Sequence, residues 1–476
     1  MKRFFIIFLT YILGCTSTIY ADIYTGKCGE NLSWTIDTKD STLTIEGTGA
    51  LWDVPWNLQV TNSWNGAKQY IKHVIIPEGV THIGGGNFAH CPCLTEIHLP
   101  STIRSIGEEA FAETTTLKSI NLPEGLDSIA YSAFYLCKGL TSITLPTTLR
   151  VIEERAFAAC TGLSTLAIPA GVQTIAGGAF LACNLTYNVA DDNPYFCLRD
   201  GIVYSKDLQI AVVCPVAKQG QYSLPDEVKT ILAYAFYESA LDAIKLPDGI
   251  DSIGKYAFAR CSSLERMDIP NSVRVIDEGA LCSNAQLQSV HLSENLTNIP
   301  YGLLAYCPKL ETVNIPKGIT YIGSSAFRND SSLVSIEMPG TMQLIGHSCF
   351  ADCHGLKYIV FHEITNKILY NCLSRCSNLE YVVCDALVPP TLNYIRDFDF
   401  ETVTLYVPEQ SIEAYREADT WKLFTHILPL SERPMSIGDV PFNSCLEQNG
   451  SKILHNGHIY IIRGNNIYTL QGQEVK

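Results

Sequence analysis

Residues 117–139 read LKSINLPEGLDSIAYSAFYLCKG, and residues 140–162 read LTSITLPTTLRVIEERAFAACTG. The two stretches align without a gap, so that a leucine, two isoleucines, a proline, an Ala-Phe pair and a cysteine recur every 23 residues. A period in this range is typical of a solenoid, in which each coil buries its apolar face against the next coil. Further units begin at Ile71, Leu94 and Leu163, and after an interruption at Leu241, Leu264, Leu287, Leu310, Leu333, Leu356 and Leu379.

Each part of the unit has a physical role. In the unit 117–139, Ile120 and Leu122 alternate with polar residues, which is the period of a half-buried strand. Pro123 ends this strand because it has no N–H to donate to a ladder. The Ala-Phe-x-x-Cys segment fits one short helical turn, with Phe134 and Cys137 on the same face. We therefore predict an α/β repeat, a curved solenoid whose coils each contain a strand and a short helical turn.

The consensus L-x-x-I-x-I-P-x-x-V-x-x-I-x-x-x-A-F-x-x-C-x-x resembles the BspA-type leucine-rich repeat of bacterial surface and secreted proteins. The proline after the strand and the Ala-Phe-x-x-Cys segment carry this resemblance, which extends over about residues 71–384. The asparagine ladder that follows the strand in eukaryotic leucine-rich repeats is absent. The resemblance implies a leucine-rich-repeat solenoid that binds host matrix proteins or neighbouring cells.

The segments outside the repeat have patterns of their own. Residues 184–222 interrupt it, and FCLRDGIVYS at 196–205 predicts a β-hairpin with an Asp-Gly turn, similar to an insertion in the BspA-type family. Terminal coils need a cover for their apolar faces and strand edges. Residues 22–70 resemble the family's N-terminal β cap, and residues 386–430 resemble its closing coil, which leaves 71–385 as the solenoid. Residues 431–476 predict a small β tail, similar to the secretion or anchoring signals of exported proteins, although a simple closing appendage is equally compatible.

The N-terminus predicts export. Lys2 and Arg3 precede an apolar stretch of secretory-signal length that is too short to span a bilayer. Cleavage after Ala21 is the favoured interpretation and makes residues 1–21 a signal peptide. Alternatively, ILGC at 12–15 resembles a bacterial lipobox, which would place a lipid anchor on Cys15. No later stretch is long and apolar enough to predict a membrane helix.

The cysteines follow the repeat. An exported chain with 18 cysteines suggests disulfides, but eight of them share one repeat position, which elsewhere holds Thr114, Ala285 or Asp330. A position that accepts small residues is a buried packing site, where a free thiol behaves as a compact hydrophobe. We therefore predict reduced, buried thiols rather than a disulfide ladder, and leave open an isolated bridge such as Cys349–Cys353.

Charge and motifs exclude several function classes. The formal net charge of −15 repels phosphate backbones and makes a nucleic-acid partner improbable. His362-Glu363 begins like a zinc-protease helix, but the required second histidine is Asn366. No nucleophile elbow, phosphate-binding loop or zinc-type cysteine pair occurs. The sequence thus predicts no enzyme, no metal site and no cofactor.

With these classes excluded, a binding function would lie on the outward face of the stacked strands. The side chains on either side of the first-strand isoleucine form two outward columns there. An exposed aromatic and β-branched group in consecutive coils is typical of interfaces. The alternative is that the tail or the 386–430 module folds back over this group. The candidate binding residues are Tyr358, Val360, Tyr381, Val383, His98, Asn121, His291 and Asn314.

Three functions are compatible with these patterns. The first is an exported, non-enzymatic protein that binds a protein or glycan through its sheet face. The second is a structural or glycan-associated envelope protein without a specific host ligand. The third is a hydrolase whose site the motifs do not identify.

Overall fold

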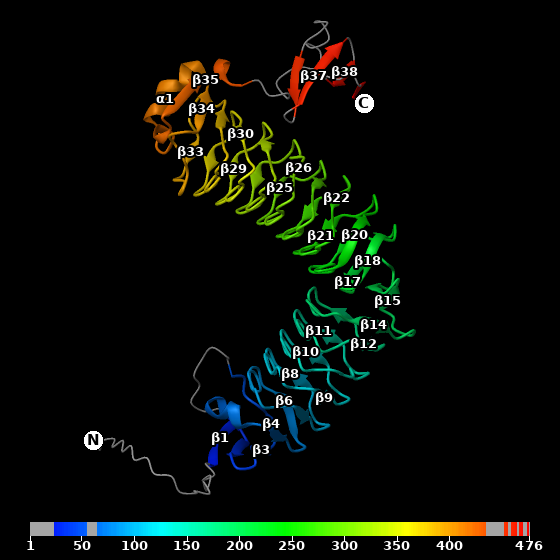
Figure 1. Cartoon of the computed structure of the whole chain (residues 1–476). Helices are drawn as coiled ribbons and strands as arrows, with labels where there is room; N and C mark the ends of the chain where they lie inside the picture. Colours follow the sequence, from blue (N-terminus) through cyan, green and yellow to red (C-terminus); the bar gives the residue numbers. More distant parts are fainter. Residues whose placement is uncertain are drawn as a thin grey trace, which may run out of the picture.

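The computed structural model describes residues 23–54 and 64–434 and the backbone of four strands between 452 and 475. The export signal and Cys15 lie outside these residues. The coils stack into an arc that runs from the N-terminal strands to a helical module near residue 420 (Figure 1). The last four strands form an antiparallel sheet of their own, in the order β36 (Lys452–His455), β37 (His458–Arg463), β38 (Asn466–Thr469) and β39 (Glu474–Val475).

Most coils contribute two parallel strands, one to each side of the arc. In the unit 117–139 these are β9 (Ser119–Asn121) and β10 (Ser128–Ile129). Second strands such as β10, β21 (Ser252–Ile253) and β29 (Leu344–Ile345) lie on the inner side of the arc, and first strands such as β9 and β22 (Arg266–Asp268) lie on its outer side (Figure 1). Register is kept because identical repeat positions pair, as Ile129 does with Ile106 and Ile152.

The inner strands form three parallel stretches. The first is β4 (Gly49–Ala50), β6 (Val80–Ile83), β8 (Ser105–Ile106), β10, β11 (Val151–Ile152) and β13 (Thr174–Ile175). The second contains β17 (Ile210–Val213), β19 (Thr230–Ile231), β21 and β23 (Val275–Ile276). The third is β25 (Asn298–Ile299), β27 (Tyr321–Ile322), β29, β31 (Lys367–Ile368) and β33 (Thr391–Leu392).

The outer strands pair in shorter groups. These are β7 (Glu96–His98) with β9; β12 (Thr165–Ile168) with β14 (Thr186–Val189); and β18 (Gln219–Ser223) with β20 (Ala240–Lys245). The next group is β22, β24 (Ser289–His291) and β26 (Thr312–Val313). The last is β28 (Ser335–Glu337), β30 (Tyr358–Phe361), β32 (Tyr381–Cys384), β34 (Thr404–Val407) and β35 (His426–Pro429).

The Ala-Phe segment is a series of turns, so the expected helical turn is a detail that the structure does not reproduce. Ser132 and Leu136 have φ angles of 53° and 58°, which an α-helix does not contain. The N–H groups of Ser132, Phe134 and Leu136 donate to carbonyls of the next coil at 3.1, 2.8 and 2.8 Å. The N–H groups of the residues between them, Ala133 and Tyr135, donate to carbonyls of the same coil. Stacking between coils therefore gives the backbone N–H groups of this segment hydrogen-bond partners. One isolated helical turn would leave several of them without a partner.

Helical structure is scarce among the described residues. The α-helix there is α1 (Ile412–Glu417), and the 3₁₀ turns are η1 (Trp64–Tyr70), η2 (Glu409–Ser411), η3 (Trp421–Leu423) and η4 (Leu430–Glu432). The strand-rich coils fit a leucine-rich-repeat solenoid. Tyr415 of α1 and Trp421 of η3 are buried at the C-terminal end of the arc, with ring centroids 5.4 Å apart.

The core is a stack of identical side chains. The rings of Phe88, Phe111, Phe134, Phe157 and Phe180 follow one another at 5.4, 5.2, 5.2 and 5.9 Å, and all are buried. A second buried core extends from the insertion to the C-terminal module. Between them, β15 (Phe196–Arg199) and β16 (Ile202–Ser205) form an antiparallel hairpin through Asp200-Gly201. At the N-terminal end, β1 (Ile23–Gly29), β2 (Leu32–Asp37), β3 (Thr42–Gly47) and β5 (His73–Ile75) form a four-stranded sheet.

The repeated cysteines are free thiols with a hydrogen-bonding role. Cys160 Sγ lies 3.0 Å from the carbonyl oxygen of Phe134 in the preceding coil, and Cys353 and Cys376 repeat this contact. Every described cysteine is free, including Cys349 and Cys353. Burial raises the pKa of Cys137 and Cys183 to about 12, so these thiols stay protonated. In the unit that begins at Leu264 the register places Asn284, rather than Ala285, at this position, and Asn284 Nδ2 donates to the carbonyl of Phe258 as the thiols do to theirs.

Candidate binding surfaces

The predicted site residues lie on the outer side of the arc, and two of the four polar ones support the fold. His98, Asn121 and His291 are exposed, and Asn314 is half-buried. The Asn121 amide accepts a hydrogen bond from the N–H of Leu99 at 2.9 Å and donates to its carbonyl at 3.2 Å. Asn314 makes the same pair of contacts with Leu292, at 2.6 and 3.1 Å. Both side-chain amides therefore take the place of a neighbouring strand's backbone as hydrogen-bond partners of the preceding coil.

The expected exposure of the aromatic and β-branched group is wrong for three of its four members. Val360, Tyr381 and Val383 are 8%, 9% and 0% exposed, and Tyr358 is half-buried. They form a small separate cluster with Tyr406 of β34 and with the half-buried Leu428 and Leu430. The outer ladder continues through β34 and β35, so the C-terminal module supplies apolar neighbours that shield the group.

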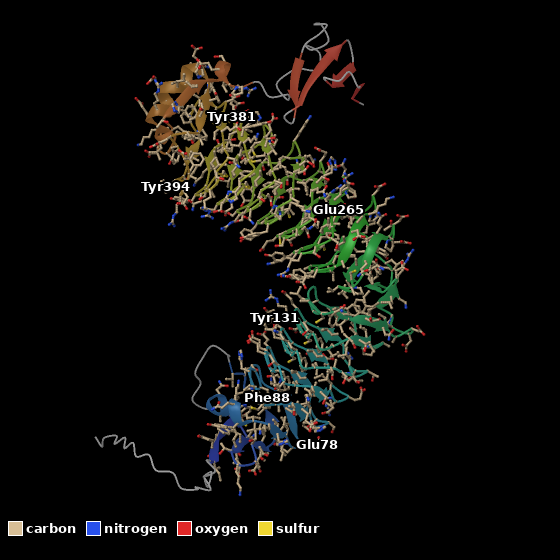
Figure 2. All side chains as sticks on the ribbon, in the orientation of Figure 1. Glu78, Phe88, Tyr131, Glu265, Tyr381 and Tyr394 are labelled. Carbon is tan, nitrogen blue, oxygen red and sulfur yellow. The ribbon has the colours of Figure 1, made fainter. Side chains whose placement is uncertain are left out.

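Exposed aromatic side chains lie instead on the inner face. Tyr301, Tyr370 and Tyr394 are 52%, 51% and 58% exposed, and His347 is also exposed. In each coil the residue lies two positions after the inner-strand isoleucine or leucine. The rings of His347 and Tyr370 are parallel, with centroids 5.7 Å apart. Figure 2 places Tyr394 at the inner edge of the arc, as it does the equivalent Tyr131 of an earlier coil. We call Tyr301, His347, Tyr370 and Tyr394 the inner aromatic row.

The number of carboxylates on the inner face changes along the arc. In the five coils from Tyr301 to Tyr394, residues 297–302, 320–325, 343–348, 366–371 and 391–396 contain no Asp or Glu, but do contain Lys367 and Arg396. The equivalent stretches near the N-terminal end include Glu108, Glu109, Glu153 and Glu154, together with Arg104, Arg150 and Arg155. There Asp53, Glu108 and Glu109 line an open hollow of about 570 Å³. Burial, followed by repulsion from Glu108, raises the pKa of Glu109.

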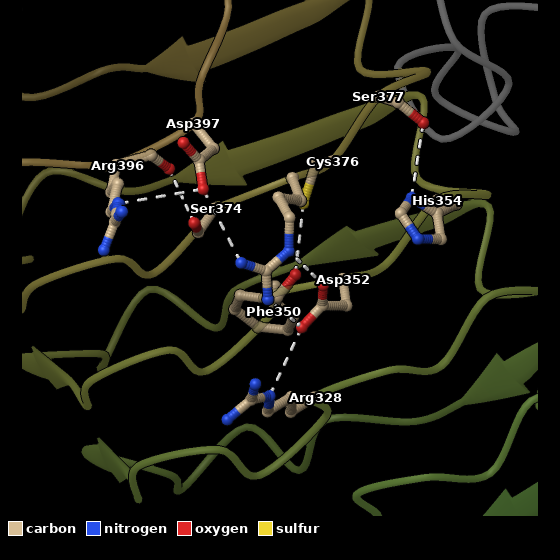
Figure 3. Close-up of polar contacts among 10 residues, drawn as sticks. Arg328, Phe350, Asp352, His354, Ser374, Cys376, Ser377, Arg396 and Asp397 are labelled. Atoms are coloured by element: carbon tan, nitrogen blue, oxygen red, sulfur yellow. Dashed lines mark hydrogen bonds and ion pairs between the residues drawn. The ribbon is translucent and has the colours of Figure 1, made fainter.

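An ion-pair ladder links the coils that carry the row (Figure 3). The Asp352 carboxylate accepts hydrogen bonds from Nε and Nη2 of Arg375 at 2.5 and 2.8 Å, and from Nε of Arg328 at 3.3 Å. Arg375 also lies 3.6 Å from Asp397. The hydrogen bond from Arg375 lowers the pKa of Asp352, whose side chain is 14% exposed. The ladder holds successive coils in register three to five positions beyond the row.

Comparison with known proteins assigns the family. The model of the BspA type leucine rich repeat region, in six copies, matches residues 63–192, 217–333 and 298–407. These matches cover more than half of the sequence. The chain belongs to the BspA-type leucine-rich repeat family. No curated protein matches it.

Bacterial proteins of known structure are similar to this chain. A leucine-rich repeat protein from Eubacterium ventriosum has a TM-score of 0.56 at 22% identity, over 70% of this chain and 95% of its own. A leucine rich cell surface protein from Faecalibacterium prausnitzii has a TM-score of 0.48 at 25% identity, over 71% and 94%. The pneumococcal vaccine antigen PcpA has a TM-score of 0.43 at 19% identity, over 86% and 98%. The first of these supports the fold.

One polar contact in this BspA-type protein resembles hydrolase residues. His82 Nδ1 lies 2.7 Å from Ser105 Oγ, and Nε2 lies 3.4 Å from Asp53 Oδ1. The repeat explains the serine, because Ser128 occupies the paired position in the next coil. The Asp53 side chain is 75% exposed and also accepts the N–H of Gly85. We assign this contact no catalytic role.

The described part of the chain contains neither a metal-binding group nor a membrane-spanning helix. Its histidine, cysteine and acidic side chains form no group of three that could hold a metal ion. No described helix is long and apolar enough to cross a membrane.

Proposed function

We propose that this BspA-type protein is an exported or cell-surface, non-enzymatic protein that binds a macromolecular partner through a sheet face of its solenoid. The inner aromatic row carries the proposal. Aromatic side chains that are half exposed in neighbouring coils are unusual on a solvated surface and common in interface hot spots. The family contributes the second support, since its members include surface antigens. Export rests on the N-terminal sequence, with cleavage after Ala21 favoured over lipidation of Cys15.

The outer face is a second candidate surface. His98 and His291 are exposed on it, and His291 pairs in register with Asp268 of the preceding coil. The Asn121 and Asn314 amides are engaged with backbone, so a ligand there would contact mainly the imidazoles. Tyr358, Val360, Tyr381 and Val383 fit a structural role better, because they pack under the C-terminal module.

The test is binding of the secreted chain to arrays of matrix proteins and polysaccharides. The double variant Tyr370→Ser and Tyr394→Ser removes two exposed rings of the row. Tyr131→Ser is the control, because Tyr131 is a half-buried tyrosine at the same repeat position in the N-terminal half of the arc. We expect a ligand whose binding the double variant loses and the control retains. Binding that survives in the double variant, and is lost on replacing His98 and His291, would move the site to the outer face. No ligand on either array would favour a structural envelope protein.

A further inference from the structure

The distance between neighbouring side chains of the inner aromatic row is close to the repeat distance of a linear polymer. His347, Tyr370 and Tyr394 come from three consecutive coils, and Tyr301 lies two coils earlier. Adjacent strands of a sheet are about 4.8 Å apart, and the rings of His347 and Tyr370 follow this advance at 5.7 Å. This step is comparable to the advance of one sugar ring in an extended polysaccharide. A linear chain along the arc would therefore meet one aromatic side chain per sugar over three coils.

Side chains beside the row suit hydroxyl groups. Asn298, Gln343 and Asn366 are exposed on the inner strands or immediately before them. An amide donates and accepts at the same time, which matches a sugar hydroxyl that does both. Aromatic rings supply the apolar contact that the C–H face of a sugar requires. The combination of rings and amides favours a polysaccharide over a purely apolar protein surface.

The local charge favours an acidic chain. The protein has a formal net charge of −15, yet the inner-face stretches of the row contain no carboxylate. Lys367 is exposed on β31, three residues before Tyr370. Arg396 follows Tyr394 by two residues, and its side chain is 77% exposed and 3.9 Å from Asp397. A cation thus lies near each of the last two rings of the row, whereas the equivalent stretches 104–109 and 150–155 near the N-terminal end carry two glutamates each beside their arginines.

From this juxtaposition we propose that the inner aromatic row binds an acidic polysaccharide along its length, with the rings under successive sugars and Lys367 and Arg396 facing their acidic groups. The inference rests on the proposed function and adds the chemical class of the partner. Carboxylate and sulfate groups share the chemistry that these cations recognise, and separate probes distinguish them.

The experiment uses the mature chain and immobilised polygalacturonate, alginate, hyaluronan and heparan sulfate. Fully methyl-esterified polygalacturonate is the neutral match, because it keeps the sugar and removes the charge. We expect at least one acidic polysaccharide to bind, and its affinity to fall on adding salt because exposed charges are screened. The Tyr370→Ser and Tyr394→Ser double variant should bind roughly tenfold more weakly or worse, as truncated interface aromatics commonly do.

Two further variants separate stacking from charge. Lys367→Gln with Arg396→Gln should reduce binding of the acidic chains and abolish the preference for free acid over methyl ester. Tyr131→Ser should bind as the parent does. Circular dichroism melting of each variant checks that the fold is intact.

Failure of this inference is distinct from failure of the proposed function. If no acidic polysaccharide binds, or if binding is indifferent to the double tyrosine variant, the assignment to polysaccharide is wrong. If in that case a matrix protein binds and the double variant loses it, the row is still a binding surface with a protein partner. If neither class depends on Tyr370 and Tyr394, the inner aromatic row is not the binding surface and both proposals for it fall.

Discussion

Replacing Asp330 by asparagine should stabilise this protein. Asp330 occupies the repeat position that elsewhere holds cysteine, and its side chain is completely buried. Oδ1 accepts the N–H of Cys307 at 2.8 Å, but Oδ2 has no hydrogen-bond partner. Desolvation by burial raises the pKa of this carboxyl well above its usual range. The folded state therefore holds this proton to a higher pH than the unfolded chain does.

The repeat itself supplies the comparison from which the magnitude follows. At the same position Asn284 donates through Nδ2 to the carbonyls of Phe258 and Leu281, at 3.0 and 2.7 Å. In Asp330→Asn, Oδ1 keeps its contact with Cys307, and Nδ2 gains the corresponding carbonyls of Leu304 and Phe327. An unsatisfied buried polar atom costs about 1–3 kcal/mol, so the variant should unfold with a free energy larger by about that amount.

The pH dependence of this difference gives the sharper test. A carboxyl whose folded pKa is raised contributes stability below its unfolded pKa and loses it as pH rises toward the folded value. The parent should therefore weaken relative to Asp330→Asn between pH 4 and pH 8, as measured by urea unfolding followed by circular dichroism. Asp352→Asn is a matched control on the ion-pair ladder. Equal stability of Asp330→Asn and the parent at pH 8, or a difference that does not grow with pH, would refute the reasoning.

Four further predictions concern the fold. Phe134→Ala should lower the free energy of unfolding by about 3–5 kcal/mol, because it leaves a cavity between two stacked rings; an unchanged urea midpoint would place this ring outside the core. Asp352→Asn should destabilise above the unfolded carboxyl pKa and have no effect at low pH, since Arg375 lowers the folded pKa of Asp352; melting curves at two pH values decide this. Tyr381→Ser should lower the melting temperature by loosening the C-terminal module, and unchanged melting would argue against the packing of Tyr381 in the small cluster with Tyr406. The repeat thiols, represented by Cys137, should react with iodoacetamide only after denaturation, and rapid labelling of the native protein would contradict their burial.

The spacing of the repeat predicts a large share of the fold. Phe134 and Cys137 recur every 23 residues, and this alone places their side chains in a common buried stack. The turn geometry was beyond such reasoning, because Leu136 adopts a positive φ against its own preference. Hydrogen bonds to the next coil stabilise that conformation, and they exist only once the coils are stacked.

The binding surface was harder to predict than the core. Tyr381 and Val383 stood out as apolar residues at outward positions, but their cover comes from Tyr406 and Leu428, whose placement depends on how the C-terminal module continues the sheet. The inner aromatic row has no consensus residue, since its position holds Ser324 between Tyr301 and His347. Counting two residues beyond the inner isoleucine in every coil would have identified it.

Tyrosine nitration with and without a bound partner tests most directly whether the inner aromatic row is the contact surface. In the free protein, tetranitromethane should modify Tyr301, Tyr370 and Tyr394, and it should spare the buried Tyr415. Tyr195 on the insertion is 44% exposed and serves as a reactive reference. With saturating ligand, peptide mass spectrometry should show protection of Tyr370 and Tyr394 and unchanged modification of Tyr195. Saturation that leaves Tyr370 and Tyr394 as reactive as before would contradict the assignment of the inner face as the binding surface.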